Sequence, residues 1–275
     1  MGVKSMNIRF LKLLQIGNII AAFLTVIVNS LANILPIGGK YTGELSDNIP
    51  NLFVPTGLTF AIWGVIYILI IIFSIYLGRD FLKVEKTTIP FLEKISYFFI
   101  LASIANILWI FLWHYEQVIF SLLAMILLFV SLLAIYLRLN IGIEKVLIKD
   151  KLFTHVPISV YLGWITVATI ANVTAVLVTI NWDGFGLSED IWTIIVILVA
   201  MIITILVLLK RKDYAYSGVI IWALLGIFLK RITDDPVFGV KTQIAYTAAI
   251  AIIIILIVTA LKYILQYIKK GYQVN

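Results

Sequence analysis

Residues 117–137, QVIFSLLAMILLFVSLLAIYL, form a stretch of 21 residues without a charged side chain, a glycine or a proline. A helix of this length rises about 30 Å, which matches the thickness of the hydrocarbon core of a bilayer. The stretch therefore predicts a membrane-spanning α-helix rather than a helix in the interior of a soluble protein.

Similar runs lie on both sides of this stretch. The whole chain of 275 residues is 63% hydrophobic and only 13% charged, which leaves too few charges to cover a soluble domain of this size. We therefore predict an all-α membrane protein with about eight transmembrane helices. The seven further runs are 13–35, 57–78, 95–113, 153–181, 191–209, 214–229 and 242–261, of which 214–229 is the shortest.

The lysines and arginines predict the orientation. With the N-terminus in the cytoplasm, 17 of the 21 basic residues fall on the cytoplasmic side and 4 on the outside. Because cytoplasmic loops carry an excess of basic residues, both termini are predicted to be cytoplasmic. Lys230, Arg231 and Lys241 oppose the pattern in the last outside loop. Orientation also explains the net charge of +7, so we expect membrane lipids and no nucleic acid as partners.

The longest outside loop runs from Pro36 to Thr56 and is rich in glycine and proline, which form turns. Loops of about 20 residues are longer than most connections and are often functional. We expect this loop to act as a lid over a site among the helices.

The eight runs contain no Asp, Glu, Lys or Arg, although transport coupled to protons or sodium usually needs ionisable groups at mid-membrane. The histidines, His114 and His155, lie near helix ends and are interpreted as interfacial polar residues, although either could be an axial haem ligand. Without cysteines, disulfides and thiolate metal sites are excluded. No general base or metal motif is recognisable, so we expect neither an enzyme nor a required cofactor.

Amides and indoles are the main polar groups of the predicted spans. Asn18, Asn29 and Asn33 in the first span are predicted to form hydrogen bonds between helices, because amides in lipid need partners.

Aromatic residues share helix faces with several of these polar groups. Trp63 lies four residues before Tyr67, and Asn106 lies three before Trp109. In the fifth span, a large aromatic, a small residue and an amide recur at every fourth position. This stripe could form the wall of a pocket for a flat apolar ligand with a polar edge, or the small residue could only permit close helix packing. The spacing leaves both interpretations open. The stripe consists of Trp164, Ala168 and Asn172.

These residues resemble the TspO/translocator protein family, also called tryptophan-rich sensory proteins or peripheral benzodiazepine receptors. The family's second, third and fifth helices carry a proline-rich turn with Trp-x-x-x-Tyr, then Asn-x-x-Trp, then Leu-x-Trp-x-x-x-Ala-Thr-x-x-Asn. Leu58 and Ala61 depart from the pattern, where the family usually has Trp and Pro. The matching residues here are Pro55, Gly57, Trp63, Tyr67, Asn106, Trp109, Leu162, Trp164, Ala168, Thr169 and Asn172.

The resemblance implies a five-helix core at 1–181, followed by a three-helix extension at 182–275 as in long bacterial relatives. It implies a multi-pass protein of the bacterial plasma membrane and, by analogy, a homodimer. The family's core encloses a pocket for porphyrins and related hydrophobic ligands, so porphyrin or haem is expected as a ligand. The residues implied to line this pocket are Trp63, Tyr67, Asn106, Trp109, Trp164, Ala168 and Asn172.

Three functions fit this resemblance. The first is a sensor or carrier that binds a tetrapyrrole or another lipid-like molecule. The second is a permease or membrane-complex subunit for another small solute, with the extension as the partner surface. The third is an enzyme that degrades the bound tetrapyrrole.

Overall fold

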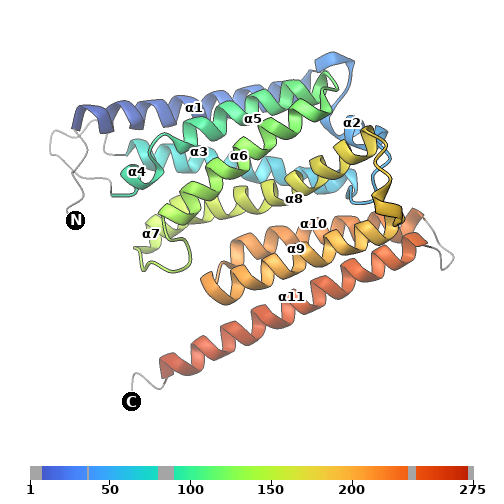
Figure 1. Ribbon diagram of the computed structural model, residues 1–275. Coiled ribbons are helices and arrows are strands. Elements are labelled where there is room, and N and C mark those ends of the chain that lie inside the picture. The colour runs from blue at the N-terminus through green and yellow to red at the C-terminus, as the bar shows by residue number, and fades with distance from the viewer. Residues whose placement is uncertain (1–7, 36, 80–89, 235–239, 272–275) are drawn as a thin grey trace.

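The computed structural model describes residues 8–35, 37–79, 90–234 and 240–271, and within these ranges all regular structure is helical (Figure 1). Seven segments are long and apolar enough to cross a membrane, and α5 is a shorter apolar helix of 17 residues. The prediction of an all-α membrane protein with about eight spans is confirmed. The long helices are α1 (Ile8–Ile34), α3 (Ile62–Gly78), α5 (Phe98–His114), α6 (Val118–Arg138), α8 (Val156–Thr179), α9 (Glu189–Arg211), α10 (Tyr214–Asp234) and α11 (Val240–Gly271).

Short helical segments occupy the connections. They are η1 (Ile37–Gly39), α2 (Thr42–Asn48), η2 (Gly57–Ala61), α4 (Pro90–Ile95), α7 (Ile148–Asp150), the π-helical turn η3 (Lys151–His155) and η4 (Gly184–Gly186).

Some helix boundaries differ from the predicted runs for local reasons. The third span was predicted from 95, but Ser96 has a left-handed φ of 52°, so the chain turns there and α5 begins at Phe98. The seventh was predicted to end at 229, where the charges begin. Instead, α10 continues through Lys230 and Arg231, whose side chains find partners in the first loop.

Helices α1, α3, α8, α6 and α5 form a closed ring in that order, each packing on its two neighbours. Helices α9, α10 and α11 form a second group beside α8, with α10 as the main contact to the ring (Figure 1). We call residues 8–181 the core and residues 182–271 the extension.

The first described turn of α1 and the last turn of α11 lie at the same end of the bundle (Figure 1). The connection that contains α7 lies there too, and we call this end the basic end. The opposite end carries α2 and the start of α9, and we call it the lid end. An even number of crossings explains why the start of α1 and the end of α11 lie at one end, as the distribution of basic residues predicts. Pro36 and the basic residues Lys4, Lys83 and Lys86 lie outside the described residues.

Buried amides join the helices of the core. Asn29 donates a hydrogen bond to Oδ1 of Asn106 at 2.5 Å, and Asn18 donates to the backbone oxygen of Ser96 at 2.9 Å. The predicted bond between helices is therefore confirmed for Asn29, which joins α1 to α5, whereas Asn18 bonds the turn between α4 and α5. For Asn33 the prediction is wrong, because its amide donates to the backbone oxygen of Asn29 one turn earlier.

Candidate ligand-binding site

A cavity of about 50 Å³ lies inside the core, toward the lid end. We call it the inner cavity. Helices α3, α5 and α8 and the turn η2 supply its aromatic wall, and the first loop closes it from the lid end. The aromatic side chains that line it are Phe60, Trp63, Trp109, Trp113 and Trp164.

The structure brings five of the seven predicted site residues to this cavity. The stripe of α8 faces it with all three members, and Trp63 and Trp109 complete the set. The other two predicted residues, Tyr67 and Asn106, lie behind this wall. Tyr67 stacks on Trp63 with ring centroids 5.7 Å apart, and Oδ1 of Asn106 accepts a hydrogen bond from Asn29.

The aromatic rings form a continuous stack. Trp63 lies 6.0 Å from Trp109, and Trp109 lies 5.9 Å from Trp113, with interplanar angles of 28° and 19°. Trp164 meets Trp63 edge-on at 6.1 Å and 83°. Parallel faces on one side and an edge on the other suit a planar guest, because aromatic rings prefer offset-stacked and edge-to-face contacts.

Sequence reasoning missed Trp113 and Phe60. Trp113 lies four residues after Trp109 on the same face of α5, and Phe60 lies three residues before Trp63. The helical period could have found both, because it places residues three or four apart side by side.

Two indole N–H groups in this wall differ in their partners. Trp109 donates to Oδ1 of Asn172 at 3.0 Å, and Asn172 also bonds the hydroxyl of Ser121. Asn172 therefore orients Trp109, in addition to lining the cavity. The buried indole N–H of Trp164 has no hydrogen-bond partner among the described residues. A buried donor without a partner is costly, so it is a ready site for an acceptor on a ligand.

The inner cavity is smaller than most ligand sites, which hold about 300–1,000 Å³. The indoles fill the space that a planar molecule would need. A guest the size of a tetrapyrrole therefore requires the lid to move or the indoles to rotate.

The first loop supplies the lid. Its residues 42–56, which we call the lid segment, contribute Thr42, Ser46, Ile49, Asn51, Val54 and Pro55 to the cavity lining. The amphipathic character of α2 explains this placement, because Thr42, Leu45 and Ser46 are buried while most of its other side chains face away. The lid segment therefore covers the inner cavity, and its action as a lid stays a prediction.

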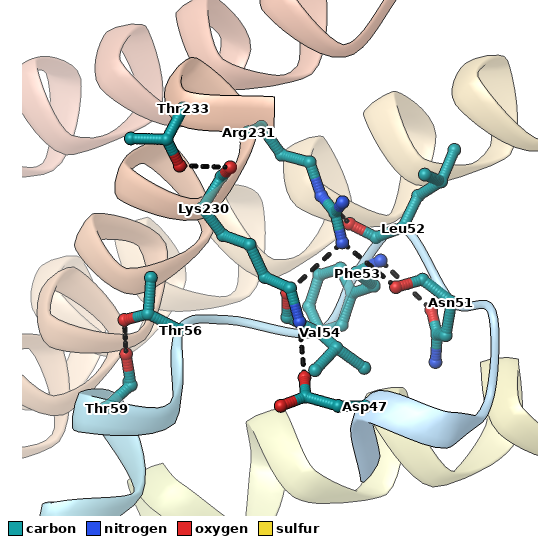
Figure 2. A network of polar contacts seen from close by, with 10 residues as sticks. All are labelled: Asp47, Asn51, Leu52, Phe53, Val54, Thr56, Thr59, Lys230, Arg231 and Thr233. Carbon is teal, nitrogen blue, oxygen red and sulfur yellow. Dashed lines mark hydrogen bonds and ion pairs between the residues drawn. The ribbon is translucent and has the colours of Figure 1, made fainter. Parts of the chain in front are cut away.

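Helix α10 of the extension holds the lid segment in place (Figure 2). Nε of Arg231 donates to the backbone oxygen of Leu52 at 3.0 Å, and Nη2 donates to the backbone oxygens of Asn51 and Val54 at 3.1 and 3.4 Å. Arg231 is only 4% exposed. The single side chain of Arg231 therefore satisfies three backbone carbonyl groups of the lid segment between α2 and η2.

Further contacts follow along the same face of α10. Lys230 pairs with Asp47 at 2.6 Å, and Trp222 donates to the backbone oxygen of Thr59 at 2.9 Å. A Cβ atom at Gly226 would lie 2.0 Å from Oγ1 of Thr59, so the close approach depends on glycine. Lys230 and Arg231, two of the three basic residues that opposed the orientation pattern, thus have structural partners at the lid end. Lys241, the third of them, is exposed.

A second, larger cavity of about 530 Å³ lies at the lid end between core and extension. We call it the junction cavity. The end of α8, the turn 181–188 and the first turns of α9 form its walls, and the lid segment forms its floor. Its side chains mix aromatic, aliphatic and acidic groups, among them Trp182, Trp192, Leu177, Val178, Asp183 and Glu189.

Comparison with known sequences agrees with this architecture: the sequence model of the TSPO-like protein family matches residues 15–261. The chain belongs to this family. The match continues through α9, α10 and most of α11, so the extension is part of what this TSPO-like chain shares with the family. No curated protein and no solved structure matches the chain significantly.

Neither histidine lines the inner cavity. His114 is buried, with ring nitrogens 2.7 Å from the backbone oxygen of Ile110 and 3.3 Å from Oγ1 of Thr42. His155 lies at the basic end, in the π-helical turn. Within the described residues, no three His, Cys, Asp or Glu side chains cluster as a metal site would require. The side chains that surround the inner cavity therefore offer stacking and hydrogen bonds rather than axial coordination.

Proposed function

We propose that this TSPO-like membrane protein binds a planar, largely apolar molecule with a hydrogen-bond acceptor at its edge, and acts as a sensor or carrier for it. The observation that carries the proposal is the unpartnered N–H of Trp164 in the wall of the aromatic inner cavity. An acceptor on the ligand would satisfy this donor, and the stacked indoles would cover the ligand's faces.

A tetrapyrrole has this chemistry, with a flat conjugated ring and polar groups at its edge. The absence of a histidine from the inner cavity lining favours a metal-free porphyrin over haem, because haem iron in proteins is usually held by an axial side chain. The described side chains around the cavity also include no carboxylate or imidazole, which favours binding over catalysis.

The test is a titration of the detergent-purified protein with protoporphyrin IX, followed by tryptophan fluorescence. We expect saturable quenching in the wild type. Trp164→Ala should weaken binding by about 1 kcal/mol or more, roughly fivefold, because one aromatic contact is lost. Trp164→Phe keeps most of the ring and removes the N–H, so it isolates the hydrogen bond.

The matched control is Trp222→Phe, which removes an indole N–H that donates to the backbone oxygen of Thr59 and lies outside the lining of both cavities. Its midpoint should equal that of the wild type, while Trp164→Phe should bind more weakly. Linear quenching without saturation, or equal midpoints for all the variants, would remove the porphyrin site from the inner cavity.

A further inference from the structure

The inner cavity and the junction cavity meet at one side chain. Asn51 of the lid segment lines both, and no other described residue does. Its neighbours divide between them, since Ile49 faces the inner cavity and Pro50 the junction cavity. On α8, Ala175 lines the inner cavity and Thr174 lines the junction cavity. The partition between the two spaces is therefore about one side chain thick.

Hydrogen bonds hold this side chain in the partition. Nδ2 of Asn51 donates to Oγ1 of Thr174 at 2.7 Å and to the backbone oxygen of Ala171 at 3.2 Å. Its Oδ1 accepts from the backbone N–H of Phe53, and its backbone oxygen accepts from Arg231. Asn51 is thus attached to α8 on one side and to α10 on the other.

The junction cavity has room for the side-chain amide of Asn51 when that side chain leaves the partition. The walls of that cavity contain polar groups among apolar side chains, so an amide that leaves Thr174 can bond to water or to these polar groups instead. The opposite walls of the inner cavity consist of packed indoles, which would have to leave an apolar environment. Movement of Asn51 is consequently the least disruptive way to open the inner cavity.

The junction cavity has the size and the surfaces to hold a planar molecule before it moves inward. Its volume of about 530 Å³ falls within the usual range for ligand sites, unlike that of the inner cavity. The rings of Trp182 and Trp192 lie 5.1 Å apart at its edge and offer aromatic faces.

We propose that the junction cavity is the access route to the inner cavity and that Asn51, held by Thr174 and Arg231, is the gate between them. In this arrangement the extension regulates access, because Arg231 belongs to α10. The inference rests on the proposed function for its ligand, but the gate can be tested without one.

The absence of native cysteines allows a direct test. Ala168→Cys places a single thiol in the wall of the inner cavity. In detergent-purified protein, the rate at which a small charged methanethiosulfonate reagent modifies this thiol reports how often water-soluble molecules reach the cavity. A charged reagent is used because it does not cross the apolar surface of the bundle.

Opening variants should accelerate the reaction. Asn51→Ala removes the gate side chain and should raise the rate by about tenfold or more, since the closed state loses its hydrogen bonds to α8. Thr174→Val removes one of those bonds with little change of shape and should act in the same direction. It keeps the test decisive if Asn51→Ala fails to fold.

A blocking variant should slow the reaction. Val178→Trp narrows the junction cavity and should lower the rate by about fivefold or more if access follows this route. Ile180→Trp is its control, since Ile180 is 52% exposed on the same helix end and lies outside the lining. Unchanged rates in Val178→Trp, or unchanged rates in both opening variants, would show that the inner cavity is reached elsewhere and would overturn the proposal.

The two proposals fail separately. If the modification rate of the thiol changes in the variants as expected but porphyrin binding does not saturate, the gate is supported and the ligand is not a porphyrin. If porphyrin binding saturates but the modification rate of the thiol is the same in all the variants, the ligand site is supported and the gate is ruled out.

Discussion

The core and the extension are both bundles of apolar helices, but they are held together differently. In the core, polar side chains join different helices, as Asn29 of α1 joins Asn106 of α5 and as Trp109 of α5 joins Asn172 of α8. In the extension, most buried hydroxyls bond their own helix one turn back, as Thr204 does to the backbone oxygen of Ala200. Small and aliphatic side chains fill its helix contacts instead, among them Ala245, Ala248 and Ala251 of α11.

The extension's buried charges point to the core rather than to its own helices. Asp213 accepts a hydrogen bond from Ser159 of α8 at 2.7 Å and caps α10 through the N–H of Tyr216. Arg231, at the other end of α10, binds the lid segment. Helix α10 is thus attached to the core at both ends by polar groups and along its length by packing. The polar groups of the extension therefore attach it to the core, whereas its own helices are joined mainly by apolar packing.

The largest expected effect concerns the close approach of α10 to the core. Gly226→Ala should destabilise the protein by about 2–3 kcal/mol, because its Cβ would press on Thr59 and Pro55. Thermal unfolding in detergent would measure this. Gly218→Ala is the matched control on the same helix, where nothing lies within 4 Å of the new Cβ. It should leave stability unchanged or raise it by up to about 1 kcal/mol through helix propensity. Equal effects at both positions would mean that α10 does not approach the core at Gly226.

The second prediction compares the adjacent charges that hold the lid segment. Arg231→Gln should cost about 1.5–2 kcal/mol of stability, because buried carbonyl oxygens lose a charged donor. Lys230→Gln should cost less than about 0.5 kcal/mol, since its ion pair with Asp47 is solvent-accessible. Both variants lose one positive charge, so thermal unfolding at low and high salt separates burial from net charge. A larger loss for Lys230→Gln would contradict the structure of the lid attachment.

The third prediction tests the polar links of the core. Asn29→Leu should destabilise by about 1 kcal/mol, the scale of one hydrogen bond between membrane helices, because Asn106 loses its partner. Adding Asn106→Leu should recover part of that loss, since no amide is then left unpaired. Asn33→Leu is the control, as Asn33 is exposed and bonds only its own helix among the described contacts. Additive losses from Asn29→Leu and Asn106→Leu would show that the two side chains do not interact.

Much of the fold could be predicted because the bilayer imposes simple rules on sequence. A span needs a long apolar run, and basic residues mark one side of the membrane, so the helices of the core and the extension could be located from composition alone. The α8 stripe was also recognisable, since Trp164, Ala168 and Asn172 repeat with the helical period. The same period could not distinguish Asn106, which binds Asn29, from the residues that line the inner cavity.

The helical class, the approximate number of spans and three of the five aromatic residues that line the inner cavity follow from the sequence, because hydropathy and helical periodicity are local properties. Only the tertiary structure decided that Arg231 binds the lid segment 177 to 180 residues earlier, that Asn51 divides two cavities, and that Trp164 has an unpartnered donor. These features depend on which helix faces pack together and on how completely side chains fill the space between them. Such pairings are set by the packing of the whole bundle, and no single segment encodes them.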